Sequence, residues 1–136
     1  MRVWEVATGA AVVLLSQAVA PISVPAAADA RLERSLRMLA PAERLEQLCD
    51  YTAMASIRKD AGNFRPERAV ANAGAEVKVK NDTIVANAGA FRSRGKWYGM
   101  AYTCSATPDH MQVLSFQYTI GGEIPEAKWA TYGLFD

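Results

Sequence analysis

Hydrophobic positions recur at helical spacing in the first half of the chain and at strand spacing in the second half. Leu32, Leu36 and Leu39 lie three or four positions apart, which predicts a short amphipathic helix that ends before Pro41. Pro41 suits the first turn of a second helix, and Gly62 can end that helix. We therefore expect two consecutive helices in this part of the chain.

The second predicted helix has one stripe of apolar and small residues. Its members recur every three or four positions, and they are Leu45, Leu48, Cys49, Thr52, Ala53, Ser56 and Ile57. We expect this stripe, with Cys49 in it, to face the core. The next stretch, residues 63–69, is predicted as a polar link that forms either a loop or a single helical turn.

Further along the chain the period changes to two. Val77 and Val79 alternate with Lys78 and Lys80, and a turn signal follows at residues 81–82. This pattern predicts a β-hairpin.

The strongest pair of strands is predicted at residues 91–106 and 111–122. Alternate positions of the first form an apolar face made of Tyr98, Met100, Tyr102 and Cys104. Those of the second form a similar face made of Leu114, Phe116, Tyr118 and Ile120. Both faces are expected to meet the helices. In the tail, Trp129 and Leu134 are expected to seal the core edge from a short helix or turn.

These elements predict an α+β protein in which two N-terminal helices pack on an antiparallel sheet of about four strands. The 136 residues, 51% hydrophobic and 21% charged, suit one globular domain. The net charge of +1 argues against a nucleic-acid partner, because binding to phosphates requires many basic side chains.

The first thirty residues differ in composition from the rest. An apolar run over residues 6–20 precedes small residues that end at positions 28–30, a pattern typical of a cleaved secretory signal. We expect residues 1–30 to be this signal and residues 31–136 to be one exported domain in the periplasm. Because apolar character persists to Val24, an uncleaved membrane anchor is the alternative, and only then would the protein contact a membrane.

The chain has two cysteines, Cys49 and Cys104, and one histidine, His110. In an oxidising compartment the two cysteines most simply form one disulfide, since both lie on predicted core faces. One alternative is a small thiol hydrolase in which His110 activates the Cys104 thiolate. A metal site would need more ligands than these three residues offer, so neither a metal nor a cofactor is predicted. A turn at residues 108–109 is expected to leave His110 facing water.

Basic side chains alternate on two of the predicted strands. With a neighbouring tryptophan they form a candidate surface for an envelope protein or an anionic envelope component, made of Lys78, Lys80, Arg92, Arg94, Lys96 and Trp97. The alternative is a solvated strand face whose charges prevent aggregation. No residue is predicted to be catalytic.

Three motifs give the chain a resemblance to a known family: "RLEQLCDYTAM", "GAFRSRGKWYGMAYTCSATPDHMQVLSFQYTIGG" and a closing "WxxYGL". The chain resembles domain-of-unknown-function family 930 over nearly all of the predicted mature part. The resemblance implies an exported protein of rhizobia or related alpha-proteobacteria with Cys49 and Cys104 paired, and it transfers no catalytic residue. The leading hypothesis is a non-enzymatic binding or interaction module of the cell envelope. The alternatives are the thiol enzyme and a membrane-anchored structural protein.

Overall fold

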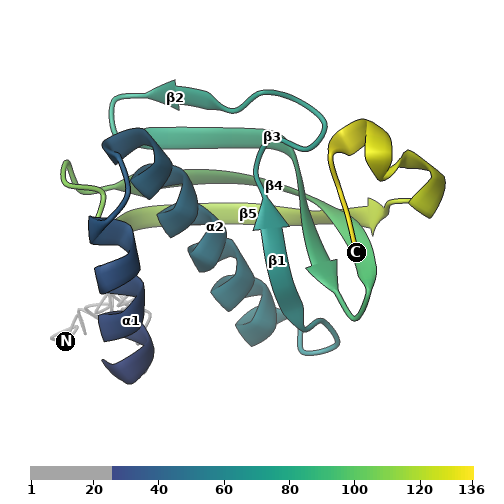
Figure 1. Ribbon diagram of the computed structural model, residues 1–136, viewed down its shortest axis with the longest axis horizontal. Helices are drawn as coiled ribbons and strands as arrows, with labels where there is room; N and C mark the ends of the chain where they lie inside the picture. Colours follow the sequence, from purple (N-terminus) through teal and green to yellow (C-terminus); the bar gives the residue numbers. More distant parts are fainter. Residues whose placement is uncertain (1–25) are drawn as a thin grey trace, which may run out of the picture.

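Two helices precede a five-stranded antiparallel sheet in the computed structural model, which describes residues 26–136 (Figure 1). Residues 1–25 of the predicted signal segment lie outside the described residues, and its last five residues form the start of α1. The elements are α1 (Ala26–Arg37), α2 (Pro41–Asp60), β1 (Pro66–Val70), β2 (Lys78–Lys80), β3 (Thr83–Ser93), β4 (Lys96–Ala106) and β5 (Val113–Glu123), followed by the short 3-10 helices η1 (Glu126–Lys128) and η2 (Ala130–Tyr132). The predicted α+β fold is confirmed, with five strands where about four were expected.

The strands β1, β3, β4 and β5 lie side by side in that order, and β2 pairs with β3 as well. Both short strands therefore lie along one edge of β3. β1 pairs with the end of β3 around Ala90 and Arg92, whereas β2 pairs with the start of β3 around Ile84. At the other side of the sheet, β5 pairs with β4 and forms the second edge.

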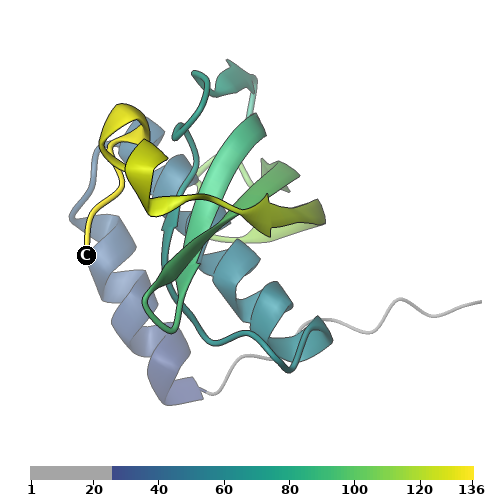
Figure 2. The ribbon, with the colours of Figure 1, turned by 90° about the vertical axis from the view of Figure 1, so that its right-hand side faces the viewer.

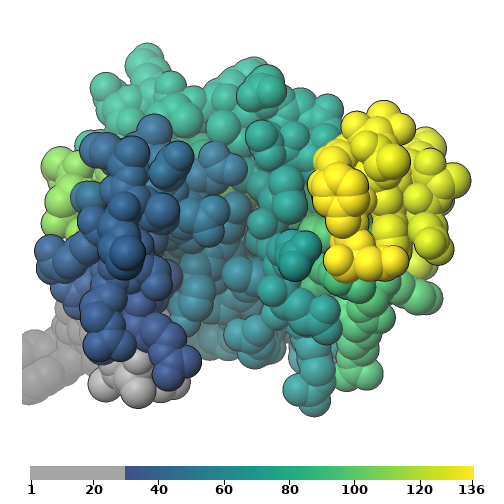
Figure 3. Space-filling model, viewed as in Figure 1, coloured from purple at the N-terminus to yellow at the C-terminus, as the bar shows by residue number. Residues whose placement is uncertain are grey.

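The core lies between α2 and one face of the sheet. From α2 the buried side chains include Leu45, Leu48 and Ile57, as the apolar stripe predicted. From the strands, Phe91 and Met100 are among the buried residues that meet them. Full burial of such a side chain stabilises the fold by about 1.5–3 kcal/mol. In Figure 3 the two helices, in blue, lie toward the left of the view, and the C-terminal segment, in yellow, lies at the right.

One strand lies where no strand was expected. Residues 66–70 form β1, so the prediction of a loop or a helical turn there was wrong. Pro66 opens this strand, and a proline is tolerated at that position because β1 is an edge strand whose first residue has no need to donate to a ladder.

A turn divides the stretch that was predicted as one strand over residues 91–106. β3 ends at Ser93 and β4 begins at Lys96, so the two strands form a hairpin. Arg94 and Gly95 have φ angles of 52° and 76°, the left-handed geometry of a type I′ turn. Arg92, Arg94 and Lys96 therefore do not share one face of one strand.

A bulge at the start of β5 changes which side chain enters the core. Ala106 pairs with Val113 and Ser105 with Ser115, which leaves Leu114 as the extra residue. Leu114 is 69% exposed, while Val113 packs against the core. The expectation that Leu114 belongs to the core face was wrong for this reason.

A second, smaller cluster lies on the other face of the β3–β4 hairpin. Its buried members are Ala90, Trp97 and Leu134, and the C-terminal segment folds over them (Figure 2). The Trp97 indole Nε1–H donates to the Phe135 carbonyl at 3.0 Å, which fastens the end of the chain. Leu134 and the partly buried Trp129 belong to this second cluster, and not to the edge of the main core where they were predicted.

Candidate functional site

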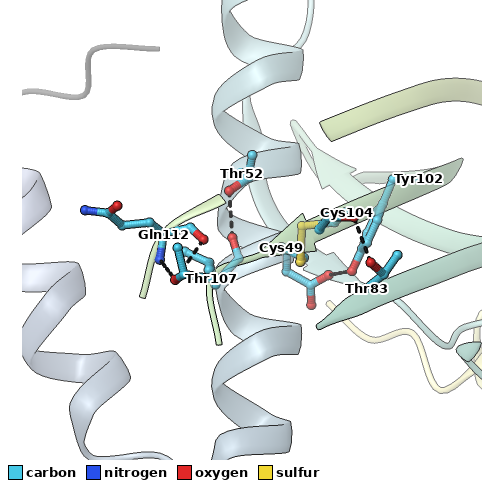
Figure 4. The surroundings of a disulfide bond; sticks show 10 residues. Cys49, Thr52, Thr83, Tyr102, Cys104, Thr107 and Gln112 are labelled. Atoms are coloured by element: carbon cyan, nitrogen blue, oxygen red, sulfur yellow. Dashed lines mark hydrogen bonds between the residues drawn. A yellow bond between two sulfur atoms is a disulfide. The ribbon is translucent and has the colours of Figure 1, made fainter. Parts of the chain in front are cut away.

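The two cysteines form a disulfide that joins α2 to β4 (Figure 4). The Cα atoms of Cys49 and Cys104 are 6.0 Å apart, and both residues are fully buried. The predicted pairing is confirmed. Neither cysteine is a free thiol, so in this state Cys104 cannot act as the nucleophile that a thiol enzyme requires.

A buried hydrogen bond lies next to the disulfide. The Tyr102 hydroxyl donates to Asp50 Oδ1 at 2.8 Å, and only 4% of Asp50 is exposed. Burial raises the pKa of Asp50 to about 7, the Tyr102 hydrogen bond lowers it in part, and the charge of Glu46 raises it further. Burial also raises the pKa of Tyr102, with Asp50 as the next cause. The pair ties α2 to β4 through a carboxyl group that holds its proton to near-neutral pH.

His110 is bound on both sides of its ring, so the expectation that it faces water was wrong. Only 12% of the His110 side chain is exposed. Its Nε2 lies 2.9 Å from Asp82 Oδ1, and its Nδ1 lies 2.6 Å from the Pro41 carbonyl oxygen. His110 therefore links the predicted turn before β5 to the β2–β3 turn and to the start of α2, which is a structural role.

Arg44 reinforces the same corner of the molecule. Its guanidinium donates to the Leu36 and Leu39 carbonyls at 2.9 and 3.0 Å, and to the Asp109 carbonyl at 3.0 Å. The Leu36 and Leu39 carbonyls lie at and just after the end of α1, where a helix leaves its last acceptors without intrahelical partners. No periodic pattern signals this role, because the bond to Asp109 joins residues 65 positions apart.

The structure does not assemble the predicted basic surface. The strand β2, which carries Lys78 and Lys80, pairs with the start of β3, while Arg92 lies near the end of β3. Trp97 is only 1% exposed, so it is not part of a surface and the prediction that placed it there was wrong. Lys96 Nζ lies 3.5 Å from Glu123 Oε1, in an ion pair of exposed side chains.

An open groove of about 430 Å³ lies on the face of the sheet that is turned away from α2, here called the outer face. Alternation along the strands defines this face. Met100 and Tyr102 of β4 belong to the core under α2, so Ala101 between them points outward. In β5, Thr119 points outward between Tyr118 and Ile120 for the same reason.

The floor of the groove is almost without side chains. It includes Gly99 and Ala101 of β4, Gly121 of β5 and Ala88 of β3. A Cβ atom added to Gly121 would lie 3.4 Å from the backbone of Gly99, which is ordinary van der Waals contact. A methyl group can therefore be accommodated at Gly121, whereas a Cβ atom at Gly89 or Gly74, which also line the groove, would lie 3.1 Å from its nearest neighbour.

The walls of the groove combine polar and apolar groups, and none of them is charged. Asn87 and Thr119 supply neutral hydrogen-bonding groups, while Ile124 and Tyr132 supply apolar surface from the C-terminal segment. The loop residues Ala73 and Gly74 complete the rim. The groove thus depends on the same segment that covers Trp97.

A second hollow lies between the two helices and is lined in part by Glu43, Glu46 and Leu39. Over residues 26–136, no three His, Cys, Asp or Glu side chains are grouped so that they could hold a metal ion. No helix in the described part of the chain has the length and apolar character needed to cross a bilayer. The second hollow is bounded by two adjacent helices, whereas three strands and the C-terminal segment frame the outer-face groove, so the groove is the better defined candidate site.

These features define a small α+β domain with one internal disulfide and one face of its sheet left largely uncovered. The chain belongs to the family described as Domain of Unknown Function (DUF930), whose model matches residues 36–134. No curated protein and no solved structure matches the chain.

Proposed function

We propose that the protein is a non-enzymatic binding module of the cell envelope and that the outer-face groove is its ligand site. The observation that supports this most is the bare floor at Gly99, Ala101 and Gly121. At each of these three positions a larger side chain would point outward and fill the groove. Small residues at all three leave room for a ligand against the backbone of the sheet.

The lining favours a neutral ligand of mixed polarity. Asn87 and Thr119 offer uncharged donors and acceptors, and Tyr132 offers an aromatic surface beside them. An N-acetylated sugar ring of an envelope polysaccharide has matching chemistry, because it presents amide and hydroxyl groups together with apolar C–H faces. This neutral ligand replaces the anionic component that the basic residues had suggested.

We place the protein in the periplasm. A disulfide is compatible with an oxidising compartment, and residues 1–30 have the pattern of a secretory signal. Export, and an origin in alpha-proteobacteria, stay predictions that rest on this pattern and on the family resemblance.

Mass spectrometry of the protein exported by its own N-terminal segment tests this placement. We expect a chain that starts near Asp29 or Arg31 and that is alkylated at cysteine only after reduction. A chain that keeps residues 1–30 would instead support the membrane-anchored structural protein. Alkylation without reduction would restore the thiol enzyme that uses Cys104 and His110.

Calorimetric titration with the trimer of N-acetylglucosamine tests the groove. Ala101→Phe places a ring in the groove, whereas Thr103→Phe places the same ring two residues along the same face, at an exposed position outside the lining. We expect the wild type and Thr103→Phe to bind alike and Ala101→Phe to bind at least about tenfold more weakly, a loss of about 1.4 kcal/mol. Equal binding by all three proteins would exclude the groove as the site, and no binding by any would exclude this ligand class.

A further inference from the structure

The two edges of the sheet differ in how they are protected from pairing with another strand. The edge formed by β1 and β2 is broken into strands of five and three residues. It carries Pro66, Arg68, Lys78 and Lys80, and proline and lysine are residues that natural sheets use to prevent edge-to-edge association.

Bulges interrupt β5 near Leu114 and near Gly121 and Gly122, but the stretch between them has no such protection. β5 has 11 residues, contains neither proline nor lysine, and has a single charged residue, Glu123, at its last position. Within the described part of the chain β5 pairs only with β4, so its outer backbone groups lie along a free edge.

We infer that the β5 edge is the interface of a homodimer, in which β5 pairs antiparallel with β5 of a second copy of this chain. Two copies of β5 can pair without charge repulsion along residues 113–122, because these residues include no Lys, Arg, Asp or Glu. Such a pair has twofold symmetry, so the same patch serves both copies and the assembly closes as a dimer.

Shape supports full overlap of the two strands. Antiparallel overlap of residues 113–123 with the same residues of a second copy places Leu114 opposite Gly122 of the partner subunit, twice in the dimer. Leu114 is 69% exposed, and a Cβ atom added to Gly122 meets nothing within 4 Å. Both positions are therefore open in the single copy, so neither side chain blocks full overlap of the two strands.

The same register supplies a charge test at two exposed positions of the outer face. Full overlap places Gln117 opposite Thr119 of the partner subunit, and both side chains are exposed in the single copy. In Q117K/T119K, each lysine therefore faces a lysine across the interface. In Q117E/T119K, each glutamate faces a lysine at the same two positions.

Analytical ultracentrifugation of the wild type and of the two double variants tests this inference. We expect a dimer for the wild type, a dissociation constant raised at least about tenfold for Q117K/T119K, and a constant at or below the wild-type value for Q117E/T119K. Thr103→Lys puts a lysine on the same face but on the inner strand β4, and it should leave the constant unchanged. Thermal unfolding of each variant confirms that the single copy still folds.

Two results would overturn the inference. One is a wild type that stays monomeric at the highest concentration at which it is soluble. The other is a dimer whose dissociation constant changes equally in both double variants, since residues 117 and 119 would then not face each other across a β5–β5 interface. Binding to the groove is a separate measurement, so either result leaves the proposed function to its own test.

Discussion

The two faces of the sheet are built from different side chains. On the face under α2, large residues such as Phe91 and Tyr102 are buried, and a disulfide crosses to the helix. On the outer face the strands present Gly99, Ala101 and Gly121 along the groove. The main core and the disulfide thus lie on one face, while the other face carries the smaller cluster around Trp97 and, beside it, the groove with its small residues.

Removal of the disulfide should have the largest effect on stability. The double substitution Cys49→Ala and Cys104→Ala releases a link between residues 55 positions apart. The free energy of unfolding should fall by roughly 4 kcal/mol, because the unfolded chain regains the freedom that the closed loop removes. Urea unfolding followed by circular dichroism measures the change, and reduction of the wild type should reproduce it. An unchanged midpoint would mean that the link is not what secures this face.

Asp50 should make the helix-covered face sensitive to pH. Since the native pKa is about 7 and the ordinary value is 3.8, the folded state keeps a proton that the unfolded state loses between these values. Stability should therefore fall as the pH rises through this window, by about 1.4 kcal/mol per pH unit from this group at most, and level off above pH 7.

Asp50→Asn isolates that contribution. The amide oxygen can still accept from Tyr102, but the side chain no longer titrates. Urea unfolding of both proteins between pH 4 and pH 8 should give a steeper decline for the wild type than for the variant. Parallel curves would show that Asp50 titrates normally in the folded protein.

On the outer face, Trp97→Phe should release the C-terminal segment at moderate cost. The variant loses the hydrogen bond from the indole to the Phe135 carbonyl and part of a buried ring. We expect a loss of about 1–2 kcal/mol in unfolding free energy and faster amide exchange at Leu134. Phe135→Ala is the matched control, because it keeps the accepting carbonyl and removes only a side chain that is 65% exposed. Equal losses in the two variants would show that the hydrogen bond does not hold the segment.

Changes to the floor of the groove should affect stability least. Ala101→Phe and Thr103→Phe both add a ring to the outer face, where it displaces no core side chain. The unfolding free energy of each should stay within about 0.5 kcal/mol of the wild type. A much larger loss for Ala101→Phe would mean that the small residues of the floor are needed for packing, and that the contrast between the faces has another cause.

The periodicity of the sequence predicted the features that depend on residues close together in the chain. The stripe on α2 placed Cys49 inward, and the alternation on β4 placed Cys104 inward, so the disulfide followed from two local patterns. The hairpin of β2 and β3 followed from a turn signal between two alternating runs. These elements are decided by local geometry, which a single sequence displays.

The errors concern turns, bulges and contacts between distant segments. The turn at Gly95 lies within a basic run whose alternation continues across it, so the pattern concealed the break between β3 and β4. Trp97 does lie on the face opposite the core, as predicted, but the C-terminal segment covers it. Such coverage depends on residues more than 30 positions away and leaves no periodic signal. The buried carboxyl of Asp50 is similar, because its partner Tyr102 lies 52 positions further on.

We propose that the outer face of the sheet binds a ligand while the face under α2 maintains the fold. Two-dimensional NMR of the labelled protein during titration with the trimer of N-acetylglucosamine tests it most directly. We expect shifts confined to amides at the groove, including Asn87, Ala101 and Thr119, with little change at Cys49 and Ala53 of α2. Shifts centred on the helices, or none at saturating trimer, would contradict it.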